Sequence, residues 1–424
     1  MMTQASAQAS ELPDATAWPL DELQQAEFAR FRELGFPTTR SESWRYTPTT
    51  QLKALTQQLL HDDGLADVDA DVKLERLLAI FPILAQVPTN RRLIFRNGVW
   101  IREQTALGLT PVARASDALG AADSALAALN GARADTTLHA RLGETPAASE
   151  LHIVHILDGD APLLAAPRIE FDILADHDVT LVEYLVQVPG SAPVFNNALM
   201  ALRLKADAKL RFRRLQVLTD NAHSVAEARI SLDARSRLDW FSIDTGAALA
   251  RNDIRLTLGG RDANADLAGV FVGNGKQHID NRLDVVHAEP GARSRQEYVG
   301  LVAERSKAVY HGKVTVAEGA DATVAHQHNR NLMLSDTSEI FARPELEIYA
   351  DEVECAHGST TGQLDDNALF YLQSRGLSRD DARRLLIEAF VASALTPVAD
   401  SPLAEPVNAI IADKLAVLGM ENKQ

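Results

Sequence analysis

The sequence predicts a mostly β fold, in which a parallel β-helix core lies between helical domains at the two ends of the chain. Alternating apolar and polar residues recur in short runs between residues 151 and 364, for example at 168–173, 254–258 and 313–316. Small or acidic turn residues follow these runs at intervals of about 26 to 33 residues, which is typical of a solenoid repeat. Helical periodicity is confined to the two flanks.

Two all-β architectures compete for the middle of the chain. A sandwich predicts strands paired in hairpins every ~8–12 residues. A parallel β-helix predicts a longer period, because each coil stacks on the coil before it and one coil cannot bury its inward side chains alone. The long interval favours the β-helix.

The first domain, residues 1–150, is predicted to be helical or mixed. An apolar stripe over residues 20–34 indicates a helix that ends at Gly35 and Pro37. Asn97-Gly98 favours the positive φ angles of a type I′ turn, so residues 91–102 are expected to form a hairpin. Residues 112–150 are rich in alanine and indicate loosely packed helix or a linker.

The last domain, residues 365–424, is predicted to be helical and to follow a β-helix core of residues 151–364. Asp365 is a candidate N-cap for a helix over 367–374, which Gly376 closes. Ser378 is expected to cap a second helix over 379–393, and a third is expected over 406–418.

Composition narrows the class of protein. The 424 residues carry a formal net charge of -16, which argues against nucleic acid or an anionic membrane as the main partner. Neither a signal peptide nor a membrane-spanning run is recognised, and the single cysteine fits a reducing compartment. We therefore expect a cytoplasmic protein.

Cys355 and His357 are the candidate metal-binding pair. They lie two positions apart, so on a strand both side chains point to one face. One thiolate and one imidazole make only half of a tetrahedral ligand set. Either a second chain supplies the rest, or this is not a metal site.

A second same-face pair, His326 and His328, lies upstream of this one by close to one coil. A coil with an odd number of residues at this point would stack the two pairs. A coil with an even number would put them on opposite faces, because a one-residue slip inverts every side chain. The sequence leaves that register open, and solvated histidines are the alternative.

The C-terminal helices are a candidate docking surface. Their apolar side chains are normally explained by core packing, but residues 370–376 are unusually aromatic for a tail. The candidate partner-binding residues are Phe370, Tyr371, Leu385, Leu386 and Phe390.

At residues 343–390 the chain resembles the C-terminal signature of the SufB/SufD family of iron–sulfur cluster assembly proteins. Asp280-Asn281-Arg282-Leu283 and His311-Gly312-Lys313-Val314 also fit the family, as does Trp44-Arg45-Tyr46-Thr47 near the N-terminus. The lone Cys355 favours the SufD type, since SufB-type chains carry more cysteines. The segment 358–362 departs from the family pattern at its middle positions, which weakens any chemical role for residues 359–361.

The resemblance implies a right-handed β-helix and a complex with a SufB-like subunit and two copies of a SufC-like, ABC-type ATPase. The C-terminal domain would dock the ATPase. A transient iron–sulfur cluster would form at the SufB–SufD interface near His357, with Cys355 as a secondary thiol beside it. The chain itself would be a scaffold and not an enzyme. Reduced flavin in the complex and a homodimer of the isolated chain are left open. The alternative from another class is a β-helix carbohydrate-active lyase or hydrolase.

Overall fold

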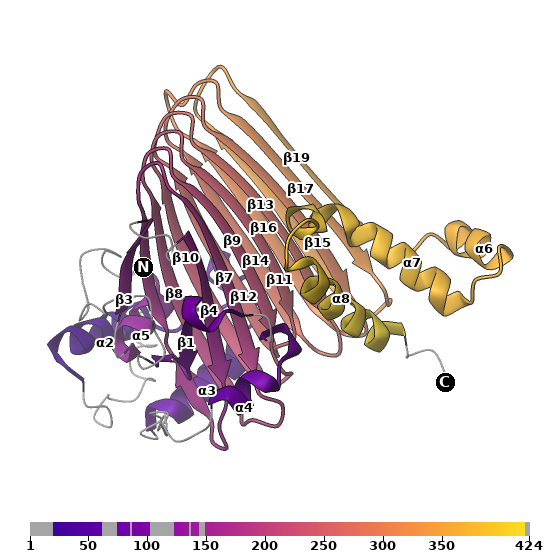
Figure 1. Cartoon of the computed structure of the whole chain (residues 1–424), viewed down its shortest axis with the longest axis horizontal. Coiled ribbons are helices and arrows are strands. Elements are labelled where there is room, and N and C mark those ends of the chain that lie inside the picture. The colour runs from indigo at the N-terminus through magenta and orange to yellow at the C-terminus, as the bar shows by residue number, and fades with distance from the viewer. Residues whose placement is uncertain are drawn as a thin grey trace.

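A parallel β-helix forms the body of the molecule (Figure 1). The structure is a computed structural model that describes residues 20–61, 74–84, 87–101, 123–134, 137–143 and 149–419. Successive strands alternate between two sheets, so that each coil adds one strand to each sheet. The hairpin-sandwich alternative is wrong, because every strand pair in the described part of the chain is parallel except the β1–β2 hairpin.

Sheet A contains, in spatial order, β19 (Glu354–Gly362), β17 (Val324–Met333), β15 (Arg293–Val302), β13 (Asn264–Gly273), β11 (Arg237–Thr245), β9 (Lys209–Val217), β7 (Asp178–Gln187), β4 (Glu150–Leu157), β1 (Arg92–Arg96) and β2 (Val99–Trp100). Sheet B contains β18 (Glu339–Ile348), β16 (Lys307–Val316), β14 (His278–His287), β12 (Leu249–Leu258), β10 (Ala222–Leu232), β8 (Val194–Leu204), β6 (Arg168–Ile173) and β3 (Thr137–Leu142), and the short β5 (Leu163–Ala165) also pairs with β8.

Coil length agrees with the predicted interval. From β3 onward the shortest step runs from His223 to Leu249, and the longest runs from Lys307 to Glu339. Alternate residues of every strand point between the two sheets and form one continuous core along the solenoid, with Phe171, Phe212 and Phe271 among its fully buried members. Each coil therefore supplies both the backbone partners and the apolar contacts that its neighbour needs.

The N-terminal helices α2 (Glu22–Leu34), α3 (Thr50–His61) and α5 (Ala125–Arg133) pack on the outer face of sheet B. Gly35 ends α2 with a φ of 69°, as the sequence predicts. Asn97 and Gly98 have φ angles of 53° and 84° at the tip of the β1–β2 hairpin, which confirms the predicted turn. Of residues 112–150, the described parts include α5 and β3, while 112–122 lie outside the described residues.

The outer face of sheet A is covered at two places. The short α4 (Leu74–Ala79) and the 3₁₀ turn η3 (Pro82–Leu84) lie near its N-terminal end. The C-terminal α7 (Arg379–Val391), η7 (Ala392–Val398) and α8 (Ala404–Gly419) pack farther along the same face. The first C-terminal helix, α6 (Asp366–Ser374), lies at the far end of α7, away from the strands (Figure 1).

A strap of residues 41–47 crosses the outer face of sheet B and includes η2 (Glu42–Trp44). The Trp44 ring lies under the Arg251 guanidinium at 3.8 Å, and Thr47 Oγ1 donates to Asp280 at 2.6 Å. Tyr46 stacks on Phe341 of β18 with 4.7 Å between ring centroids. The aromatic and polar side chains of the strap thus fasten the N-terminal region to strands from β12 to β18.

Candidate functional site at the end of the solenoid

The last coil, formed by β18 and β19, is the open end of the β-helix. In the described part of the chain these are the final strands of their sheets, so each presents an outer edge to solvent. Their side chains are at most half-buried, whereas β15 and β16 bury most of theirs. An edge of unpaired N–H and C=O groups is a template for pairing with another chain.

Cys355 and His357 share one face of β19, as their spacing predicts, and the structure shows that this face points into the solenoid. Cys355 pairs with Ala325, a core residue of β17, and is itself half-buried against the core. His357 pairs with Gln327 and is exposed, because no further coil covers it. Both side chains therefore face the interior of the solenoid. They do so in the last described coil, where no further strand covers that interior.

His326 and His328 point away from the interior of the solenoid. His326 pairs with Ala356 and His328 with Gly358, so the step between these coils is an even number of residues. This register puts His326 and His328 on the outer face of sheet A, where His326 lies 3.4 Å from Glu354. The hypothesis that the two pairs stack into one site is therefore wrong.

Buried amide side chains lie beneath His357 on the inward face of sheet A, and the sequence pattern does not identify them as part of a site. Gln327 is 1% exposed, and neither polar atom of its side-chain amide has a hydrogen-bond partner among the described residues. Gln296 lies beneath Gln327, and beside them Asn329 bonds to Asn331 and Ser359. In the sequence, an inward-facing amide cannot be told from an outward-facing polar residue of the same strand. Only the strand register shows that Gln296 and Gln327 stack beneath His357.

The surroundings of Cys355 favour its protonated thiol. Burial raises the pKa of the Cys355 thiol, and the neighbouring Glu354 carboxylate adds to that rise. The thiol is therefore protonated at neutral pH in the isolated chain. Among the described residues, no group of three or more His, Cys, Asp or Glu side chains is placed to hold a metal ion.

The second predicted surface is the exposed face of α6 and α7. Phe370 is 73% exposed, Tyr371 56% and Leu385 45%. Asp365 caps α6, and Ser378 caps α7 by accepting from the Asp381 N–H at 3.1 Å, so both predicted helix starts are confirmed. Side chains this large and this exposed are unusual on a surface that stays in water.

Leu386 and Phe390 lie elsewhere. Together with the ends of β17 and β19 they line a cavity of about 290 Å³, and the Arg330 guanidinium lies 5.4 Å from the Phe390 ring centre. The buried residues of α7 are Ala382, Ile387 and Val391, and the last two pack on the apolar outer face of sheet A.

Within the described residues, no helix has the length and apolar character to cross a membrane.

Comparison with known proteins gives consistent matches. A family model described as "SUF system FeS cluster assembly, SufBD core domain" matches residues 155–390. The chain is 26% identical over 402 residues to the iron–sulfur cluster assembly protein SufD of Escherichia coli, which covers 92% of both chains. It is 31% identical over 258 residues to an iron–sulfur cluster assembly SufBD family protein of Synechocystis sp., covering 59% of this chain and 57% of that one. A chloroplastic protein of Arabidopsis thaliana, ABCI7, is 28% identical over 225 residues, covering 53% and 47%.

Proposed function

Because the chain belongs to the SufB/SufD family of iron–sulfur cluster assembly proteins and is of the SufD type, we propose that it is a scaffold subunit whose last coil forms one wall of a cluster-assembly site. The role in cluster assembly follows from the family. The observation that carries the proposed site is the shared inward face of Cys355 and His357 on a strand with a free edge.

The nascent cluster is the cargo of this site. Iron in iron–sulfur clusters is held mainly by cysteine thiolates, with histidine as a known alternative. His357 and Cys355 supply two candidate ligands, so a partner that pairs with the last coil would have to supply the others. A SufB-like subunit is the partner that we propose, and its strand would continue sheet A beyond β19.

His357 is the principal ligand in this proposal. Its imidazole is exposed and lies over the Gln327 side-chain amide, which has no partner in the part of the chain that the structure describes. That amide can orient the ring by a hydrogen bond to its second nitrogen. Cys355 is the secondary ligand, because burial raises the pKa of its thiol and iron or a nearby cation must first displace the proton.

The test is His357→Ala co-expressed with SufB-type and SufC-type subunits. We expect the complex to assemble with normal stoichiometry and the cluster absorbance after anaerobic reconstitution to fall at least tenfold. The matched control is His328→Ala, which removes an imidazole from the outer face of the neighbouring strand. If His357→Ala builds clusters at the rate of the unaltered chain, the ligand role is wrong.

We also propose that α6 and α7 dock a SufC-like, ABC-type ATPase. Phe370, Tyr371 and Leu385 offer exposed apolar area on a small helical unit that projects from the solenoid (Figure 1). Ile387 and Val391 of α7 pack against sheet A. A movement of α6 would therefore be transmitted through α7 to the β-helix. Leu386 and Phe390 would act within the cavity behind this surface.

Phe370→Ser tests the docking surface. The variant should lose co-purification with the SufC-type ATPase and keep the melting temperature of the unaltered chain, since the side chain is mostly in water. Leu23→Ser is the matched control, because Leu23 is 48% exposed on α2 at the other end of the molecule. Equal recovery of the ATPase by both variants would contradict the proposal.

The remaining expectations concern the assembled complex. ATP hydrolysis by the partner, and not by this chain, stays a prediction, as do reduced flavin in the complex, a cytoplasmic location and a homodimer of the isolated chain. Family membership favours cluster assembly over the carbohydrate-active alternative.

A further inference from the structure

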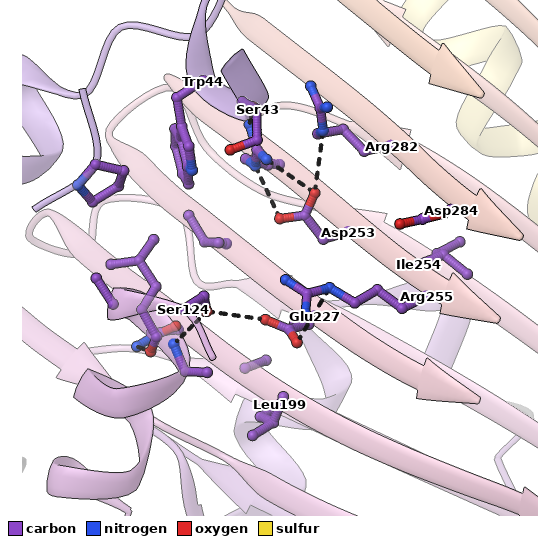
Figure 2. A pocket seen from close by; sticks show the side chains of 18 of the residues that line it. Ser43, Trp44, Ser124, Leu199, Glu227, Asp253, Ile254, Arg255, Arg282 and Asp284 are labelled. Atoms are coloured by element: carbon purple, nitrogen blue, oxygen red, sulfur yellow. Dashed lines mark hydrogen bonds and ion pairs between the residues drawn. The ribbon is translucent and has the colours of Figure 1, made fainter. Parts of the chain in front are cut away.

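Arginines on the outer face of sheet B lie beside carboxylates (Figure 2). Arg255 lies 3.7 Å from Glu227, and Arg282 lies 3.7 Å from Asp253. Asp253 also bonds to Arg251 at 3.1 Å. Inside the solenoid, between the two sheets, the balance of charge is different.

Four titratable side chains face this interior in the described strands from β4 to β12. They are His155 on β4, Glu183 on β7, Arg214 on β9 and Asp244 on β11. Each lies on the face of its strand that carries apolar residues of the core. The exposed fractions of the four side chains are 5%, 11%, 6% and 1%. Water therefore screens their charges little.

Arg214 is the cation of this cluster, and its contacts are unequal. Its Nε lies 3.3 Å from Glu183 Oε2, its Nη2 donates to Gln216 at 3.2 Å, and its Nη1 donates to Asn252. Asp244 Oδ1 is farther away, at 3.8 Å from Nη1, and has no hydrogen-bond partner among the described residues. Asp244 is therefore a second carboxyl group beside a guanidinium that already contacts Glu183.

Glu183 is the carboxyl group that balances Arg214. Its Oε1 lies 3.2 Å from the Nε2 of His155, and its Oε2 faces the guanidinium. Although burial opposes its charge, these contacts with His155 and Arg214 lower the pKa of Glu183. Glu183 is therefore ionised at neutral pH.

The nearest strands place only uncharged side chains directly against Asp244. In the register of sheet A its neighbours are Gln216 on β9 and Phe271 on β13. Its hydrogen-bonding neighbours are the Ser242 hydroxyl and the Asn252 amide. These groups can solvate a neutral carboxyl group, but they supply no positive charge.

The more distant groups do not change this balance. Burial raises the pKa of the Asp244 carboxyl, Arg214 offsets only part of that rise, and the charge of Glu183 adds to it. Burial also raises the pKa of Tyr298 on β15, so its phenol is neutral and carries no charge toward Asp244.

We propose that the interior of the solenoid binds one proton, which is held on the Asp244 carboxyl while Glu183 and Arg214 are both charged. With a neutral His155, the cluster then has no net charge, which is the least costly state for groups removed from water. The protonated carboxyl gains an O–H donor, for which the Ser242 hydroxyl and the Asn252 amide oxygen are acceptors. This site does not depend on the proposed role in cluster assembly.

The bound proton makes the stability of the solenoid depend on pH. The unfolded Asp244 carboxyl releases its proton above 3.8, whereas the folded carboxyl keeps it at neutral pH. Unfolding therefore releases this proton, and the free energy of unfolding falls as the pH rises toward the folded pKa. Asp244→Asn removes the effect, because an amide has nearly the shape of a neutral carboxyl group and does not titrate.

Urea titrations of the full chain at pH 7 and pH 8 test the proposal. Between these values the unfolding constant of the unaltered chain should rise about tenfold more than that of Asp244→Asn, because one proton is released. Infrared spectroscopy at pH 7.5 should show a protonated carboxyl band that is weaker in Asp244→Asn. Leu23→Ser, at an exposed position of α2, is the control and should behave as the unaltered chain.

Three outcomes would overturn the proposal. The first is an equal pH dependence in Asp244→Asn and the unaltered chain. The second is loss of that dependence in His155→Gln alone, which would place the proton on the imidazole. The third is a fall in the urea midpoint at pH 7.5 as large in Asp244→Asn as in Glu183→Gln, which would make Asp244 an ionised partner of Arg214.

A variant that does not fold leaves the infrared measurement. The unaltered chain, labelled with ¹³C at the aspartate carboxyl groups, should show a protonated aspartate band at pH 7.5. Absence of that band would overturn the proposal without any substitution.

Discussion

Arg251 shows how single residues fasten the N-terminal strap to the solenoid. Its side chain is 2% exposed, Asp280 is fully buried, and the Trp44 ring covers the guanidinium. A further bond reaches the Ser43 carbonyl at 2.7 Å. A buried charge network of this kind is stable only while every member is present, because each partner left alone would keep an uncompensated charge out of water.

Arg251→Met should therefore destabilise the fold by about 3 to 5 kcal/mol, since Asp280 would stay buried without its cation. Urea denaturation followed by circular dichroism measures the change. Arg255→Met is the control, because Arg255 is 39% exposed in its side chain and exposed pairs contribute about 0 to 1 kcal/mol. A loss in Arg251→Met no larger than the loss in the control would show that the network is not needed.

His287 gives the fold a pH dependence. It is fully buried at the end of β14, its Nε2 lies 2.8 Å from Ser294 Oγ, and burial lowers its pKa from 6.5 to about 4. Between those values the unfolded chain binds a proton that the folded chain does not. The stabilisation is complete above pH 6.5 and is lost as the pH falls toward 4.

Unfolding free energies at pH 7.5 and pH 5 should differ by about 2 kcal/mol less in His287→Gln than in the unaltered chain. Denaturant titrations at the two pH values provide the measurement. Leu23→Ser, at an exposed position of α2 that carries no titratable group, should leave the difference unchanged. An identical pH dependence in His287→Gln would mean that the buried imidazole is protonated in the folded state.

At the level of elements, the stacking of coils depends on glycines that make room for aromatic rings. Gly300 of β15 faces inward beside Phe271 of β13, and a Cβ built there would lie 2.3 Å from a ring carbon. Gly269 has the same relation to Tyr298, at 2.4 Å. These contacts involve rigid rings in the core, which cannot move aside as the end of a flexible side chain can.

Gly300→Ala is expected to cost about 1 to 3 kcal/mol through overpacking. The midpoint of urea denaturation checks this. Gly362→Ala on β19 is the matched control, because no atom of the neighbouring described residues lies within 4 Å of a Cβ built at that position. Equal midpoints for the two variants would show that the interior adapts without cost.

At the level of the whole molecule, the last coil has a free strand edge at β19, where another chain can pair. The Glu354 N–H donates to Thr323 at 2.9 Å, so the N–H groups of alternate residues from Glu354 onward point toward β17. Those of the residues between them, including Ser359, point toward the outer edge. Proline is tolerated at such an edge position and blocks pairing there.

Ser359→Pro is thus predicted to reduce co-purification with a SufB-type subunit at least tenfold while the melting temperature of the isolated chain changes little. Thr360→Pro removes a bond within the sheet and should instead lower the melting temperature. Size-exclusion chromatography and thermal scans separate the two effects. Retention of the complex by Ser359→Pro would exclude pairing through this edge of β19.

Local and repeating features were determined by the sequence alone. The period of the alternating runs predicted the β-helix, since every coil must present the same pattern to its neighbours. Gly35, Asn97-Gly98, Asp365 and Ser378 marked turns and helix ends, because their chemistry acts within a few residues. That Cys355 and His357 share a face needed only a strand, whereas the inward direction of that face came from the structure.

Tertiary structure decided whatever depends on the relation between distant segments. The coil between β17 and β19 has an even number of residues, so His326 and His357 point to opposite faces of sheet A. This register, the Gln327 amide below the His357 imidazole and the strap over Arg251 all follow from the packing of coils and flanks. A periodic pattern specifies a coil only approximately, but a slip of one residue inverts a face. Register is therefore set by the summed packing of the whole solenoid, which no local run of residues encodes.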